Sequence, residues 1–172
     1  MDFSNSWLVD ALEFAHTGRV LHDETPLARF SRLCEGLPAP QDGTIAWRLA
    51  GRADSQGNAW LDVRARGEVR VTCQRCLEVF GLPVEVDNSL RLLRTQAQLE
   101  AMDALEASGQ GGEEYLVAEG RLDALDLVED ELILAVPYAP RHEVCPDGPA
   151  GGRDADHARP SPFAALERLK RH

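Results

Sequence analysis

Four residues that could bind a metal ion stand in two short pairs. Cys73 and Cys76 enclose two residues in VTCQRCLEVF, and His142 and Cys145 enclose two in PYAPRHEVC. Thiolates and imidazole are ligands that zinc prefers, and a Cys-x-x-Cys turn lets two thiolates reach one tetrahedral ion. The two pairs could therefore form a Cys3His zinc site. Because four protein ligands leave no position for a substrate water, such a site would be structural.

A metal-free reading of the same residues stays open. Cys73 continues the apolar face of a predicted strand, so it could be a small buried hydrophobe. The His142 and Cys145 pair precedes a stretch rich in Gly and Pro and could bind nothing. Cys34 stands alone and is predicted to pack in the interior. A thioredoxin-like redox role fits poorly, since it places the first thiol at a helix N-terminus and this motif lies between two predicted strands.

The chain lacks the sequence motifs of common catalytic sites. It has no P-loop, no G-x-S-x-G, no Rossmann glycine pattern and no H-x-E ahead of a P-C-x-x-C. The carboxylates of its acidic segment have no histidine partner. We therefore expect a protein that is not an enzyme.

The strongest periodicity predicts a sheet. From Leu61 to Cys73 every second residue is apolar or small, which indicates a half-buried strand bent at Gly67. A strand is also predicted from Thr44, before the turn DSQGN, and another around 84–92, where Pro83 marks its start or a sheet edge. The expected fold class is α+β, an antiparallel β-meander over 44–94 that is covered by helices and followed by flexible linkers and a short C-terminal helix.

The remaining elements are predicted around this meander. Residues 1–40 are expected to be helix and loop, with a helix near 27–33, and residues 95–113 an acidic helix followed by the flexible link SGQGG. In 114–145, a strand at 115–118 precedes the covering helix, which Asp123 caps and Pro137 ends. Its predicted buried face consists of Leu125, Val128, Leu132 and Ala135. Residues 1–145 would form one domain, 146–162 a linker, and 163–172 a basic amphipathic helix.

Charge and hydropathy restrict the class of protein. The net charge is −11 over 172 residues, which argues against a wholly basic surface for nucleic acid. No apolar run approaches the roughly 20 residues needed to span a bilayer, and the N-terminus lacks a signal-peptide pattern. We expect a cytoplasmic protein with reduced thiols and with no membrane or DNA partner.

Three groups of residues could contact a partner, and each could equally be ordinary surface or core. The strand arginines could bind RNA phosphates, the acidic side chains of the covering helix could bind a basic protein, and the apolar stripe of the C-terminal segment could anchor a recognition helix or cap the core. In this order the candidates are Arg64, Arg66, Arg70 and Arg75; Asp126, Glu129 and Asp130; and Phe163, Leu166 and Leu169.

Several segments together resemble a known family. TCQRCLEVF, LDLVEDELILAVPYAPRHEVC and SPFAALERLK occur in the order typical of the bacterial YceD family, the large ribosomal RNA subunit accumulation proteins. The resemblance implies a non-enzymatic role in the synthesis, processing or stability of 23S ribosomal RNA. Its partners would be the large-subunit rRNA precursor, ribosomal proteins or processing enzymes. It maps the family's cysteine and histidine positions to Cys73, Cys76, His142 and Cys145. The alternative is a zinc-stabilised adaptor with a non-ribosomal partner.

Overall fold

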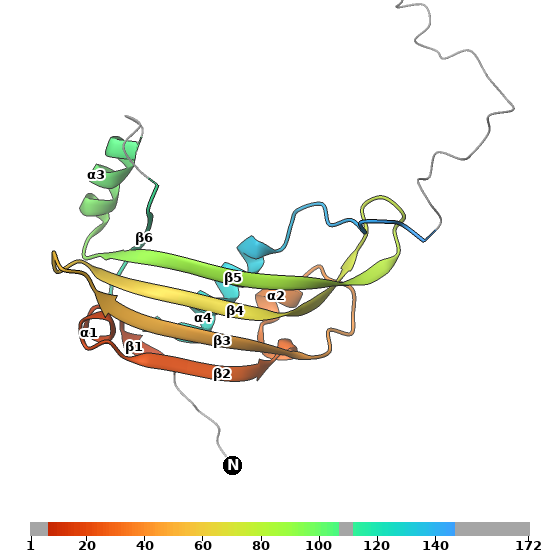
Figure 1. Cartoon of the computed structure of the whole chain (residues 1–172), viewed down its shortest axis with the longest axis horizontal. Coiled ribbons are helices and arrows are strands. Elements are labelled where there is room, and N and C mark those ends of the chain that lie inside the picture. Colours follow the sequence, from red (N-terminus) through yellow and green to blue (C-terminus); the bar gives the residue numbers. More distant parts are fainter. Residues whose placement is uncertain (1–6, 107–111, 147–172) are drawn as a thin grey trace, which may run out of the picture.

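The computed structural model describes residues 7–106 and 112–146 of the chain. These residues form a five-stranded sheet and a two-stranded sheet, with helices packed on one side of the larger sheet (Figure 1). The elements in chain order are β1 (Leu8–Asp10), α1 (Ala11–His16), β2 (Val20–Pro26), the 3-10 helix η1 (Leu27–Arg29), α2 (Ser31–Cys34), β3 (Thr44–Ala53), β4 (Ala59–Thr72), β5 (Val79–Leu93), α3 (Gln96–Glu106), β6 (Glu114–Val117), β7 (Arg121–Asp123) and α4 (Ala124–Ala135).

The predicted α+β meander is confirmed. Strands β2, β3, β4 and β5 are antiparallel neighbours in sequence order, and β6 joins the edge of β5 in the parallel direction. The alternation along β4 puts Leu61, Val63, Val69 and Val71 in the core. Gly67 continues this face, and a Cβ there would lie 2.4 Å from Cδ1 of Ile45. A side chain at this position would therefore have to displace the buried Ile45 side chain of β3.

The prediction for the first forty residues is wrong in part, because two strands lie there. β2 pairs with β3 along its whole length, from Val20 opposite Ala50 to Pro26 opposite Thr44. Only Thr25 of β2 is buried, since β2 is an edge strand, and so no alternation marks it in the sequence. The helix predicted near 27–33 is present as the two short pieces η1 and α2.

Strand β5 corrects the position of one predicted boundary. It begins at Val79, four residues before Pro83. Pro83 lies opposite Glu68 of β4, while β6 pairs only with residues from Leu90 to Leu93. The other side of Pro83 therefore faces no strand of the described residues. The prediction of an edge position is confirmed, and that of a strand start is wrong.

Helix α4 covers the sheet as predicted, with contacts to β3, β4 and β5. Its N-cap is Asp123, whose carboxylate accepts a 2.9 Å hydrogen bond from the Leu125 backbone N–H. The buried face differs from the predicted one, since Leu125 is half-buried and Ala135 is exposed. The side chains that point into the protein are those of Ala124, Leu127, Val128, Glu129, Glu131 and Leu132.

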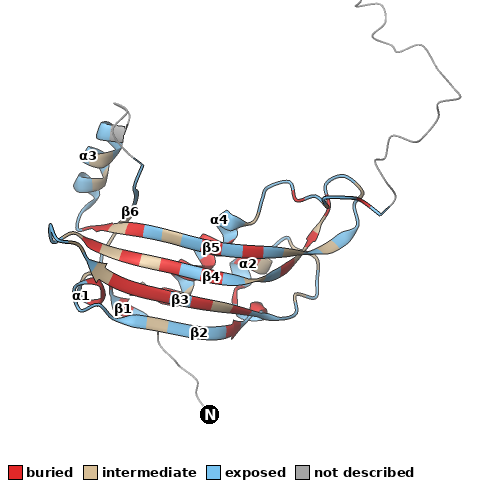
Figure 2. Cartoon of the chain, viewed as in Figure 1, coloured by how far each residue is buried: buried red, intermediate tan, exposed pale blue. Residues whose placement is uncertain are grey.

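The opposite face of the five-stranded sheet carries no helix in the described part of the chain (Figures 1 and 2). No described helix is long and apolar enough to cross a membrane. Residues 147–162 of the predicted linker and the predicted helix 163–172, with Phe163, Leu166 and Leu169, lie outside the described residues, as does most of the SGQGG link.

Candidate metal centre

A tight turn between β4 and β5 presents the first cysteine pair. The Leu77 N–H donates to the Cys73 carbonyl at 2.9 Å, and the Cys73 N–H donates to the Glu78 carbonyl at 2.9 Å. Leu77 has a φ of 65°, the one positive value outside glycine among the described residues. This left-handed conformation costs a residue with a Cβ roughly 1–2 kcal/mol. It curls the chain around the two thiols, so we name residues 73–78 the cysteine turn.

The segment after α4 brings the second pair to this turn. The Gln74 N–H donates to the Pro140 carbonyl at 2.8 Å, which joins the cysteine turn to the chain leaving α4. The His142 ring stacks against Phe80 of β5, with ring centroids 4.2 Å apart. Backbone pairing and ring packing therefore place His142 and Cys145 beside Cys73 and Cys76, as the sequence predicted.

The four ligand atoms have the spacing of a tetrahedral site. All lie within 4.8 Å of one another. The Cys73 and Cys145 sulfurs are 3.8 Å apart, and His142 Nδ1 lies 3.4 Å from the Cys76 sulfur and 3.9 Å from the Cys145 sulfur. Zinc with bonds of about 2.3 Å to sulfur and about 2.0 Å to nitrogen would separate its ligands by about 3.5–3.8 Å. The donor set and its geometry therefore fit a metal ion.

Hydrogen bonding from the backbone favours the anionic form of one of the sulfurs, while burial works against it. Burial works to raise the pKa of the Cys73 thiol, but the backbone N–H groups of Cys76, His142 and Arg75 outweigh it and lower the pKa to about 5. At Cys76 the Glu78 N–H favours the thiolate, yet burial and the neighbouring sulfurs of Cys145 and Cys73 raise the pKa to about 11. Ionisation of one thiol therefore disfavours ionisation of its neighbour, and a bound divalent cation would offset this repulsion between the thiolates.

Arg75, predicted as an RNA contact, lies against this cluster. Its Nε–H donates to the Cys145 sulfur at 2.9 Å, and its Nη2 donates to the His142 carbonyl at 3.0 Å. The Cys145 sulfur raises the pKa of the guanidinium. Arg75 therefore balances the charge of the sulfurs and holds the ligand segment in place.

The other predicted strand arginines lie on the open face of β4. Arg64 pairs with Asp87 at 3.0 Å, and Arg70 donates to the Pro40 carbonyl at 3.2 Å. The Arg66 side chain makes no hydrogen bond or ion pair with any residue in 7–106 or 112–146. Arg48 lies opposite Arg64 in the sheet register and was missed, because neighbouring strands share a face only once their pairing is known.

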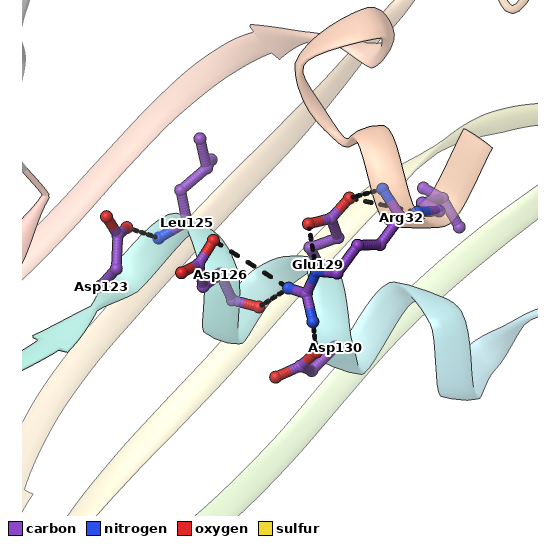
Figure 3. Close-up of polar contacts among 7 residues, drawn as sticks. Arg32, Asp123, Leu125, Asp126, Glu129 and Asp130 are labelled. Atoms are coloured by element: carbon purple, nitrogen blue, oxygen red, sulfur yellow. Dashed lines mark hydrogen bonds and ion pairs between the residues drawn. The ribbon is translucent and has the colours of Figure 1, made fainter. Parts of the chain in front are cut away.

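The acidic side chains predicted to dock a basic protein instead surround Arg32 of α2 (Figure 3). Arg32 Nε donates to Glu129 at 3.0 Å, and its Nη2 donates to the Asp126 carbonyl at 3.1 Å. Its Nη1 donates to Asp130 at 2.5 Å. Glu129 is buried, so its assignment to an exposed docking surface is wrong, while Asp126 and Asp130 are exposed. No short-range signal reveals Arg32, since it lies 97 residues before Glu129.

Fold and cluster together define an α+β protein with a Cys3His centre that could hold a metal ion, and the centre joins a strand-connecting turn to the exit of a helix. Over residues 61–170 the chain matches the family described as large ribosomal RNA subunit accumulation protein YceD. This span is more than half of the 172 residues, and the chain belongs to that family. No solved structure matches the chain.

Proposed function

We propose that this protein is a non-enzymatic factor for the synthesis, processing or stability of 23S ribosomal RNA, acting in the cytoplasm during large-subunit biogenesis. The observation that carries the proposal is the family match over residues 61–170. The partner would be the large-subunit rRNA precursor, a ribosomal protein or a processing enzyme.

The cluster supports a structural part in this function. Three thiolates and an imidazole are a donor set typical of closed zinc sites, and Cys73 and Cys145 are 0% and 2% exposed. Bound zinc would supply a cross-link between the cysteine turn and the segment after α4. We propose zinc as the ion. Near-stoichiometric zinc in protein purified without chelator, removed by Cys76→Ala, would support the site, and metal-free protein of normal stability would end the proposal.

Depletion of the protein tests the ribosomal role. We expect the ratio of large- to small-subunit rRNA to fall and to recover when the wild-type gene is returned. An unchanged ratio, with normal sedimentation of large subunits, would refute the role. Complementation of depleted cells with Arg64→Gln and, separately, with Arg66→Gln tests whether the open face of β4 contributes to the ribosomal role. Arg66 has no side-chain partner among the described residues, so a phosphate-binding role predicts the larger loss there.

A zinc-stabilised adaptor with a non-ribosomal partner is the second candidate. The observation that favours it is the Cys3His cluster, which could hold a structural ion and so stabilise a binding module whatever its partner. Affinity purification from growing cells separates the two candidates. Recovery of large-subunit precursors, ribosomal proteins or processing nucleases favours the ribosomal role, and their absence favours the adaptor.

A further inference from the structure

The most exposed large apolar side chains of the described residues lie in two stretches of the chain that meet at the metal centre. They are 72–103% exposed, and all lie on the cysteine turn or on the stretch from the last turn of α4 to Cys145. These residues are Leu77, Leu134, Tyr138 and Val144. Isolated exposed apolar residues are normal on a protein surface, but their concentration in two segments joined to one another is the pattern of an interaction site.

Leu77 is the most informative of them. Its backbone is left-handed, with a φ of 65°, and its side chain is 72% exposed. Glycine would adopt this φ without steric strain and would expose no apolar side chain. Leucine therefore brings two unfavourable features to the folded chain and no buried contact that offsets them. Strained backbone of this kind is concentrated at functional positions, which indicates that the side chain serves a contact outside the chain.

The cluster holds this surface in a defined shape. Gln74 is hydrogen-bonded to the Pro140 carbonyl at 2.8 Å and Arg75 to the His142 carbonyl at 3.0 Å. The segment that carries Val144 is thus fixed against the cysteine turn that carries Leu77. An apolar surface that is already ordered loses little conformational entropy on binding.

The charges around this surface indicate what it binds. Residues 74–79 and 138–145 contain two arginines, Arg75 and Arg141, and two glutamates, Glu78 and Glu143. The Arg75 side chain is already hydrogen-bonded to Cys145. A phosphate backbone would meet no net positive charge here. A protein surface can offer apolar area together with charges opposite to those of Glu78, Arg141 and Glu143, whose side chains form no ion pair with any described residue.

We infer that Leu77, Tyr138 and Val144 form a docking surface for an apolar patch on a protein component of large-subunit precursor particles. The choice of particle rests on the proposed function. Leu77 is the central contact, because it lies on the cysteine turn and combines an exposed side chain with a left-handed backbone.

The experiment measures co-sedimentation of the full chain with precursor particles purified from depleted cells, and separately with protein-free 23S rRNA. The variants are Leu77→Gly and Tyr138→Ser, and the matched control is Leu105→Ala on α3, another exposed leucine far from the centre in the sequence. Leu77→Gly removes strain, so its melting temperature should equal or exceed that of the wild type. We expect its affinity for particles to fall about tenfold or more, while Leu105→Ala binds as the wild type does.

Each outcome decides the inference. If Leu77→Gly and Tyr138→Ser bind particles with wild-type affinity, the inference is overturned and the ribosomal role still stands. The same holds if the wild type fails to bind particles although depletion lowers the amount of 23S rRNA. Loss of binding to protein-free rRNA in Leu77→Gly would make RNA the occupant, and loss of self-association in ultracentrifugation would make it a second copy of the chain; both contradict the inference. An unchanged ratio of large- to small-subunit rRNA on depletion would refute the ribosomal role alone, because the docking surface is tested separately by co-sedimentation.

Discussion

Replacing Glu129 with alanine should destabilise the fold through helix α2, although Glu129 itself lies on α4. Its side chain is only 6% exposed. One oxygen accepts the Arg32 N–H at 2.7 Å and the Leu33 N–H at 3.1 Å, and both donors belong to the first turn of α2. The N–H groups of a first helical turn have no partner within the helix, so Glu129 acts as a distant cap that fastens α2 to α4.

The size of the effect follows from these two bonds. A hydrogen bond to a charged acceptor contributes about 1.5–3 kcal/mol, but the end of a helix of only four residues can partly turn toward water once the cap is lost. We therefore expect Glu129→Ala to lower the free energy of unfolding by about 2–4 kcal/mol. Glu129→Gln keeps an oxygen for the two N–H groups and loses the charge, so it should lower that free energy by about half as much.

Urea unfolding followed by tryptophan fluorescence measures these differences, because Trp47 is buried beside the partly buried Trp7 in the same core. The matched control is Asp130→Asn, which changes an exposed partner of Arg32 and should leave stability nearly unchanged. The reasoning would be refuted by a Glu129→Ala variant within about 0.5 kcal/mol of the wild type, the range of ordinary surface substitutions. It would also be refuted if Asp130→Asn and Glu129→Ala had equal effects.

Three further predictions concern other parts of the described structure. Burial raises the pKa of Glu131, so the folded state binds its proton more tightly than the unfolded state, and the stability of the fold falls as pH rises above about 4.5. Glu131→Gln still accepts the Asn88 hydrogen bond and carries no charge at any pH. In urea titrations it should become progressively more stable than the wild type between pH 4 and pH 7. Gly51→Ala should lower the free energy of unfolding by about 1–3 kcal/mol and should lower the melting temperature with it, because a Cβ would lie 2.4 Å from the Phe14 carbonyl oxygen of α1. A strong chelator should lower the melting temperature of the wild type by differential scanning fluorimetry and leave Cys76→Ala unaffected.

These three predictions have direct controls. A stability difference between Glu131→Gln and the wild type that does not change with pH would contradict the assignment of the buried carboxyl. Gly81→Ala is the control for Gly51→Ala, since its Cβ would meet only the movable Glu68 carboxylate, and equal effects of the two would exclude a backbone clash as the cause. A chelator effect of the same size in the wild type and in Cys76→Ala would show that the chelator acts elsewhere.

The sequence predicts those features that local spacing determines. The alternation in β4 and the cap at Asp123 are each visible within about a dozen residues, and the structure confirms them. The two ligand pairs were also visible, but the hydrogen bond from Gln74 to the Pro140 carbonyl, which brings them together, leaves no trace in spacing. The prediction of a metal centre therefore depended on residue chemistry, and its geometry came from the fold.

Features that depend on distant pairing were missed. Edge strand β2 buries only Thr25, so its residues lack the two-residue period that marks a half-buried strand. Glu129 was read as a surface acid because burial of a carboxylate depends on a donor from elsewhere, here α2. Arg75 was assigned to RNA because nothing in the sequence shows that Cys145 lies 2.9 Å from its guanidinium.

The pairing of β1 with β7 has a consequence for the order in which the chain folds. Leu8 lies opposite Asp123, and the Ala124 N–H donates to the Trp7 carbonyl at 3.1 Å, so the first described residues pair with some of the last. The meander from β2 to β5 joins strands that are neighbours in sequence and can form early, whereas β1 must wait for a partner more than a hundred residues later. During synthesis we therefore expect β1 to stay unpaired until β7, which directly precedes α4, has been made. Docking of α4 on the sheet and closure of the small second sheet would then be late, coupled events.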